Sequence, residues 1–160
     1  MDGRVVALHR KPETAGERGL PKRAYEEVEV DRTGVKGDFN RYRVEVLHGD
    51  PDSAILLMPL ETLQQLNREG WPVRHGDLGE NITTEGLPYD TLRPGTKWRM
   101  GPAIVEVTRA CTPCDNLYLL PYVGAEKGPQ FLKVMLDRRG MYARVVSPGR
   151  IHVGDRIAPT

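Results

Sequence analysis

Glycine and proline interrupt this chain at short intervals throughout its length. The 17 glycines and 13 prolines are scattered singly through 160 residues and form no single tract. Because both residues mark turns and end regular elements, this distribution favours many short elements over a few long helices or a disordered region. It predicts an α+β fold that is predominantly β, with a β-barrel-like core and two or three inserted helices.

The hydrophobic pattern divides the chain into short apolar runs. It predicts strands at residues 3–9, 25–30, 54–58, 81–84, 97–100, 103–108, 142–146 and 150–157. One helix is predicted to open at Pro59 and to end at Gly70, and another to start at Pro129 and stop at Gly140. The segments 11–22 and 33–43 are predicted loops, and no β-α-β alternation is expected.

Length and charge limit the class of protein. A chain of this length is expected to form one domain, residues 1–160, and to bury about 70 % of its unfolded surface. Its 23 basic and 22 acidic residues lack the basic excess that is typical of nucleic-acid binders. No apolar run approaches the roughly 20 residues that span a bilayer, and the N-terminus does not resemble a signal peptide. We therefore expect a cytoplasmic protein with no membrane partner and no nucleic acid as a polymeric partner.

The two cysteines, Cys111 and Cys114, lie three residues apart and directly follow the predicted strand at 103–108. In a reducing compartment their thiols are available to bind a soft metal, transfer sulfur or exchange a disulfide. A thioredoxin-like redox pair would need a β-α-β setting, and structural zinc would need a second pair of ligands. Two small buried hydrophobic side chains are the plainest alternative. The spacing alone leaves these readings open.

Three glycine-rich segments add polar groups that could surround a ligand. Two of them, residues 47–54 and 75–84, precede predicted strands and carry side chains that form hydrogen bonds; these are His48, Asp52, Ser53, Asn81 and Thr83. The third segment, residues 34–43, places Lys36 and Arg41 beside glycines, as an anion-binding loop does. Ordinary polar turns are the alternative interpretation for each segment taken singly.

Taken together and in order, these segments resemble the MOSC domain, which is named after the C-terminal domain of molybdenum-cofactor sulfurase. The matching residues are Gly34-Val35-Lys36-Gly37-Asp38, His48-Gly49 with Pro51-Asp52 and Ala54, Gly79-Glu80-Asn81-Ile82-Thr83-Thr84-Glu85-Gly86-Leu87, Arg109 with Pro113-Cys114 and Leu117, Tyr142-Ala143-Arg144-Val145, and Gly154-Asp155. The likeness is closest to the small stand-alone bacterial members and extends over nearly the whole chain.

The resemblance implies a MOSC-type β-barrel-like fold that binds molybdenum cofactor (molybdopterin), a pterin dithiolene carrying a phosphate. In this family a late cysteine is understood to supply a thiolate ligand to molybdenum, and Cys114 matches that position. Cys111 matches a less regular family cysteine, so its role stays open. The chain departs from its relatives at Asn116, where a basic residue is frequent, and in the amino-acid sequence of residues 39–43.

The resemblance also suggests which side chains meet the cofactor. Lys36, Arg41 and Arg109 are candidates for its anionic end, because guanidinium and ammonium groups suit phosphate. The short polar side chains are candidates for the pterin or for the surroundings of the metal; they are His48, Asp52, Ser53, Asn81 and Thr83.

Family relatives indicate an oxidoreductase that reduces small N-hydroxylated or N-oxide substrates, as the mitochondrial amidoxime-reducing component does. The chain carries no flavin or nicotinamide fingerprint and has too few cysteines for its own iron–sulfur cluster. An electron-transfer protein or reductase is therefore the expected partner. A non-enzymatic carrier of sulfur, as a persulfide on Cys114, or of the cofactor itself is the alternative.

Overall fold

The computed structural model describes residues 2–12, 21–39 and 48–160. The strands are β1 (Gly3–Arg10), β2 (Arg23–Tyr25), β3 (Glu27–Asp31), β4 (Gly34–Val35), β5 (Ile55–Pro59), β6 (Ile82–Glu85), β7 (Lys97–Met100), β8 (Ala103–Ala110), β9 (Met141–Ser147), β10 (Gly149–His152) and β11 (Arg156–Pro159). The helices are α2 (Leu60–Arg68) and α3 (Gly124–Val134), with short 3-10 turns η1 (Pro51–Ser53), η2 (Tyr89–Thr91) and η3 (Asp115–Leu119).

Seven strands close into a barrel. They follow one another in the order β11-β7-β8-β9-β5-β6-β1, and pairing of β1 with β11 completes the ring. Strand β2 continues from β1, and β10, β3 and β4 form a second, small sheet. Closure removes the exposed sheet edges that would otherwise invite aggregation. The predicted barrel-like, mostly β fold is therefore confirmed.

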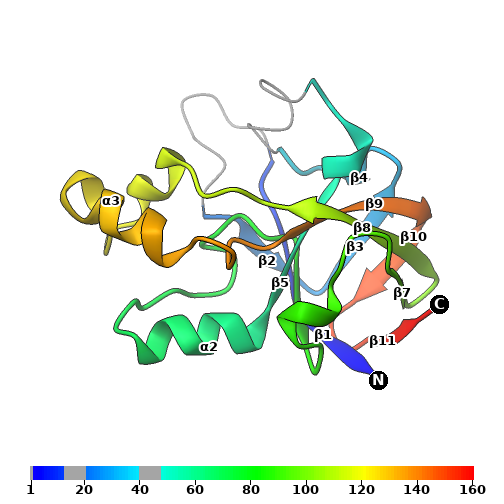
Figure 1. Ribbon diagram of the computed structural model, residues 1–160. Coiled ribbons are helices and arrows are strands. Elements are labelled where there is room, and N and C mark those ends of the chain that lie inside the picture. The colour runs from blue at the N-terminus through cyan, green and yellow to red at the C-terminus, as the bar shows by residue number, and fades with distance from the viewer. Residues whose placement is uncertain (1, 13–20, 40–47) are drawn as a thin grey trace.

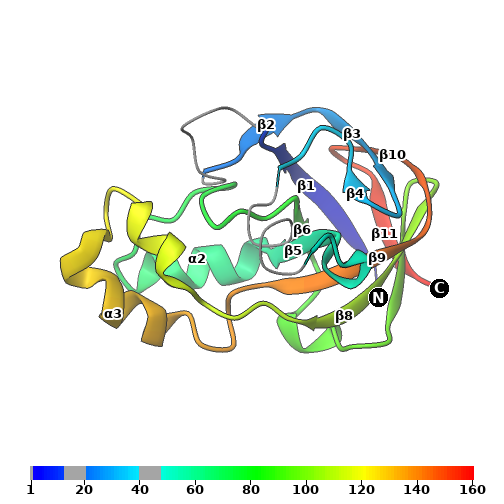
Figure 2. The ribbon, with the colours of Figure 1, turned by 90° about the horizontal axis from the view of Figure 1, so that it is seen from above.

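Helices α2 and α3 lie on one side of the barrel and cover a core of their own (Figures 1 and 2). Inside the barrel, alternate residues such as Ile55 and Leu57 are fully buried. Met58 of the same strand points into the second core, where Leu66 of α2 and Phe131 of α3 meet it. Each fully buried side chain of this size contributes roughly 1.5–3 kcal/mol, so both cores stabilise the arrangement of β5.

One pair of strands in the described part of the barrel is parallel. Strands β5 and β6 run in the same direction and are joined by a connection that contains α2. The expectation that the chain has no β-α-β unit is therefore wrong. The cysteines lie outside this unit, because they follow β8, and so the setting of a thioredoxin-like pair is still missing.

Three expected elements have different bounds in the structure. The run at 150–157 forms two strands, because a turn at Gly154, with φ +96°, separates β10 from β11. The run at 25–30 is likewise split between β2 and β3. Helix α3 begins at Gly124, so Pro129 lies inside it and not at its start. None of the described helices is long and apolar enough to cross a membrane.

Candidate functional site

Arg109 lies near the end of β8 and faces the short turn that precedes β5. Its guanidinium donates a hydrogen bond to Ser53 Oγ and approaches Asp50 Oδ2 at 3.3 Å. It also lies over the ring of Tyr142, 5.4 Å from the ring centroid. Ser53 is fully buried, whereas the Arg109 side chain remains 42 % exposed. Arg109 is therefore held in place while part of its positive charge can still meet an anion.

The local register explains how Arg109 reaches this position. Tyr142 on β9 pairs with Leu56 on one side and with Arg109 on the other, and a β-bulge interrupts the ladder just before Arg109. Bulges of this kind redirect side chains and occur next to functional sites. Thr108 Oγ1 donates to the carbonyl oxygens of Asp52 at 2.5 Å and Tyr142 at 3.2 Å, which ties η1 to both strands.

The two cysteines follow Arg109 and differ in their surroundings. Cys111 is buried against Leu56 and Tyr142, and its backbone amide donates to the carbonyl oxygen of Gly140 at 2.9 Å. Cys114 is half-buried and stands immediately before η3. Both thiols are free. Cys114 is therefore the more accessible of the two, and Cys111 serves mainly to pack the outer face of the barrel.

A buried polar network lies next to this face. Asn81 Oδ1 accepts the backbone amide of Leu56 at 3.0 Å, and Asn81 Nδ2 donates to Asp38 Oδ2 at 2.9 Å and to the carbonyl of His9 at 3.3 Å. Lys22 Nζ approaches the same Asp38 oxygen at 2.7 Å, with both side chains almost completely buried. Both Asn81 amide hydrogens thus have acceptors within the protein, so Asn81 positions this network.

The structure places the other candidate residues in several different surroundings. Lys36 is 61 % exposed and pairs with Glu29 at 2.9 Å, on the small sheet. His48 is exposed, in a left-handed backbone conformation with φ +52°. The Asp52 side chain is also exposed, while its backbone carbonyl oxygen accepts from Thr108, the neighbour of Arg109. Thr83 is fully buried on β6 and its hydroxyl has no hydrogen-bond partner among the described residues. Arg41 lies outside the described residues.

Sequence reasoning missed a buried acid, Glu80, which directly precedes Asn81. Burial raises the pKa of Glu80 to about 7, against the opposing effects of nearby backbone amides and of Arg139. In the described part of the chain, neither Glu80 oxygen nor Arg139 Nε and Nη1 has a hydrogen bond of normal geometry. Glu80 lies in the glycine-rich segment at 75–84, but nothing in the residue pattern of that segment predicts that its side chain is completely buried.

A structural zinc site finds no support in the described residues. No group of three or more His, Cys, Asp or Glu side chains lies close enough to hold a metal ion in the ranges 2–12, 21–39 and 48–160. A structural zinc ion takes four protein ligands, so the described residues do not provide a complete zinc site at Cys114.

A family model for the MOSC domain matches residues 44–158 of the chain. The chain belongs to the MOSC domain family. The match begins after β4, yet the barrel also needs β1, which pairs with β6 and β11. Asp38 likewise lies before the matched range and bonds to Asn81 within it. The family resemblance expected from the sequence is therefore confirmed.

Two curated bacterial proteins are similar in sequence to this MOSC protein. YflK, an uncharacterized protein of Bacillus subtilis (strain 168), is 31 % identical over 144 residues, which cover 86 % of this chain and 61 % of YflK. YiiM of Escherichia coli (strain K12) is 28 % identical over 131 residues, which cover 78 % of this chain and 55 % of YiiM. The chain thus spans little more than half the length of these relatives.

Two solved structures share the fold. YiiM from Geobacillus stearothermophilus superposes with a TM-score of 0.73 at 26 % identity, covering 99 % of this chain and 75 % of that one. The YUAD protein from Bacillus subtilis gives a TM-score of 0.79 at 18 % identity, covering 98 % of this chain and 94 % of that one. At that identity the second likeness shows the fold alone.

Proposed function

We propose that this MOSC domain binds molybdenum cofactor, with the thiolate of Cys114 as its ligand to molybdenum. The observation that carries the proposal is the free, half-buried Cys114 thiol, five residues after the anchored guanidinium of Arg109. Thiolates are soft ligands that suit such a metal. Membership of the MOSC family, whose name derives from molybdenum-cofactor sulfurase, adds support.

The residues present fit an anionic cofactor that carries its own metal ligands. Arg109 offers a fixed and partly exposed positive charge, while Ser53 and Asp50 hold it in orientation. Two buried polar atoms, Thr83 Oγ1 on β6 and Asn116 Oδ1 two residues after Cys114, have no hydrogen-bond partner among the described residues and remain available to polar groups. Lys36 contributes only if its pair with Glu29 opens.

We further propose that the protein is an oxidoreductase acting on small N-hydroxylated or N-oxide compounds. When bound, the cofactor supplies two-electron chemistry with oxygen-atom transfer. In balanced form, a hydroxylamine takes up two electrons and two protons and yields an amine and water. The electrons come from a separate electron-transfer protein or reductase, because the chain has only two cysteines and no nicotinamide or flavin fingerprint.

Metal and pterin analysis of matched cysteine variants tests the proposal. Protein from a host that makes the cofactor is expected to contain molybdenum and fluorescent pterin in equal amounts, with no stoichiometric zinc. Cys114→Ala should lose the molybdenum, whereas Cys111→Ala should retain most of it, because Cys111 is packed against Leu56 and Tyr142. Equal loss in both variants would argue for a shared cysteine site.

Activity and mass spectrometry separate the enzyme from the carrier. Loaded protein with a competent reductant should convert a hydroxylamine to the amine, and Cys114→Ala should not. If folded protein contains a persulfide on Cys114 and no molybdenum, the carrier function replaces the enzyme. If loaded protein leaves every N-hydroxylated compound unchanged, cofactor binding stands and the oxidoreductase proposal fails.

A further inference from the structure

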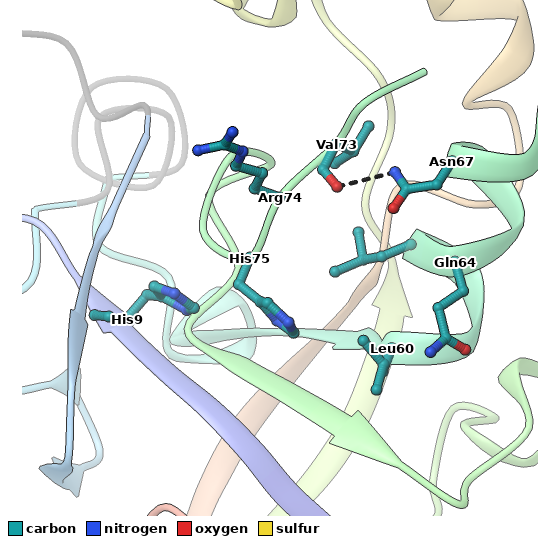
Figure 3. A pocket seen from close by; sticks show the side chains of 9 residues that line it. His9, Leu60, Gln64, Asn67, Val73, Arg74 and His75 are labelled. Carbon is teal, nitrogen blue, oxygen red and sulfur yellow. Dashed lines mark hydrogen bonds between the residues drawn. The ribbon is translucent and has the colours of Figure 1, made fainter. Parts of the chain in front are cut away.

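A pocket of about 400 Å³ opens between α2 and the segment that leads to β6, apart from the cysteines (Figure 3). Its apolar wall comes from Leu60 and Leu63 of α2 and from Val73. Asn67 Nδ2 donates to the carbonyl oxygen of Val73 at 3.0 Å, which fixes this wall against the helix. The volume lies within the range of about 300–1,000 Å³ that is typical of small-molecule sites.

The polar side of the pocket is basic. Arg74 and His75 stand exposed at its rim, and none of the described residues that line it is acidic. The neighbouring carboxylate of Asp77 is engaged elsewhere: one oxygen accepts the backbone amide of Arg74 at 3.0 Å and the hydroxyl of Tyr122, also at 3.0 Å. Figure 3 shows the Arg74 side chain extending away from Val73 and Leu60, so its charge lies at the outer part of the rim. A guanidinium and an imidazole at the mouth of a pocket with an apolar wall suit an anion that carries an organic body.

His9 forms the inner end of the pocket and lacks a full set of partners. It is only 2 % exposed, and its Nδ1 has no hydrogen-bond partner among the described residues. Its ring lies near that of His75, with centroids 6.3 Å apart and an interplanar angle of 14° (Figure 3). Burial, His75 and Lys22 lower the pKa of His9 to about 4, so the ring is neutral at pH 7.

We propose that this pocket binds a small organic carboxylate. The acid group meets Arg74 and His75 at the rim, and the hydrocarbon body lies against Leu60, Leu63 and Val73. Inorganic phosphate fits less well, because it would leave the apolar wall uncovered. The lining of the pocket does not include Cys114, so the site adds a second ligand to the function proposed above.

Titration of the full chain with benzoate tests the proposal, with benzamide as the uncharged match and inorganic phosphate as the match without a hydrocarbon body. Calorimetry should show saturable binding of benzoate and at least about tenfold weaker binding of the other two. In nuclear magnetic resonance spectra, benzoate should shift the ring signals of His9 and His75 and leave those of His152 unchanged. Equal affinity for benzamide, or ring shifts at His152 alone, would overturn the proposal.

Charge-neutralising variants locate the site. Arg74→Gln and His75→Gln should each weaken benzoate binding, Arg74→Gln by about tenfold, because it removes a charge-assisted hydrogen bond. Arg93→Gln removes an exposed cation outside the pocket and should leave the affinity unchanged. Equal weakening in all three variants would show general charge attraction in place of a site. The absence of saturable binding by the folded wild-type protein would also contradict the proposal.

Discussion

Asn81 donates a hydrogen bond of 2.9 Å to the carboxylate of Asp38, across 43 positions of the sequence. The same Asp38 oxygen receives Lys22 Nζ at 2.7 Å, and the other accepts the backbone amide of Lys11 at 2.8 Å. One carboxylate thus joins three segments of the chain. Asn81 also accepts a hydrogen bond from the backbone amide of Leu56, so the network joins the residue before β6 to the start of β5.

Replacing Asp38 by asparagine should destabilise the protein strongly. The change keeps the shape of the side chain but leaves the ammonium of Lys22 buried, where only 2 % of its side chain is exposed. Removing one partner of a buried ion pair costs about 3–5 kcal/mol. Urea denaturation of Asp38→Asn at pH 7 measures this loss in the free energy of unfolding.

Two companion variants identify the cause. Lys22→Met added to Asp38→Asn should restore part of the stability, because no unpaired charge is then buried. Glu29→Gln breaks the exposed pair with Lys36 and should have a much smaller effect. If Asp38→Asn and Glu29→Gln lower the free energy of unfolding equally, the loss in Asp38→Asn does not come from leaving a buried charge unpaired.

Gly140→Ala should be costly because two effects coincide there. Gly140 has φ +105°, and an added Cβ would stand 2.8 Å from the carbonyl oxygen of Leu57. The left-handed conformation alone costs a side chain about 1–2 kcal/mol, and overpacking adds about 1–3 kcal/mol. The hydrogen bond from Cys111 to the Gly140 carbonyl should weaken, which amide hydrogen exchange at Cys111 would detect.

Gly95→Ala provides the matched control for the substitution at Gly140. Gly95 also has positive φ, at +91°, but an added Cβ there would meet nothing within 4 Å. We expect Gly95→Ala to lose about 1–2 kcal/mol, from backbone strain alone. A loss at Gly140 no larger than the loss at Gly95 would show that the chain relaxes away from Leu57.

The sequence carried enough information for the barrel but not for every boundary. Strand β7, at 97–100, follows from alternation that the fold preserves, with Trp98 and Met100 buried. The start of α3 was wrong because Pro129 looked like a first-turn residue. In the structure the helix begins five residues earlier, where Val123 and Phe131 join a core built by distant elements. Such contacts cannot be inferred from local signals.

The candidate site was predictable only in part, for a similar reason. Arg109 and Ser53 were both expected, although their pairing depends on strand register. Lys36 was expected at an anion site, but the β3–β4 hairpin turns it toward Glu29. Lys22 lay in a predicted loop, and only packing against Asp38 buries it. The likeness to MOSC domains singled out Cys114, and its role as a metal ligand stays a prediction.

His9 should make the protein less stable in mild acid. Its pKa is about 4 in the folded state and 6.5 as a free side chain, because burial, His75 and Lys22 all oppose its protonation. The unfolded chain therefore takes up a proton that the folded chain does not, and stability falls as the pH drops from 6.5 to 4. Allowing for solvent screening, we expect a loss of up to about 2 kcal/mol.

Urea denaturation between pH 7 and pH 5 measures the effect of His9. His9→Gln should remove this component of the pH dependence, while His152→Gln, on the exposed surface, should keep it. This interval lies above the range in which most carboxylates titrate, with the exception of Glu80. An unchanged slope in His9→Gln would show that His9 is protonated as easily when folded as when unfolded.

Glu80 should act in the opposite direction over an overlapping interval. Burial raises its pKa from 4.5 to about 7, so the folded state favours the neutral acid. Stability is then greatest below pH 4.5 and falls as the pH rises to 7, by roughly 3 kcal/mol at most. In the wild-type protein the contributions of His9 and Glu80 partly cancel between pH 4.5 and 6.5.

Single variants should reveal each contribution. Glu80→Gln leaves His9 unopposed, so stability should rise with pH between 4.5 and 6.5. His9→Gln leaves Glu80 unopposed, so stability should fall with pH over the same interval. The double variant lacks both groups whose pKa is shifted, so its stability should be nearly independent of pH over this interval. A flat profile in His9→Gln would mean that Glu80 ionises normally in the folded protein.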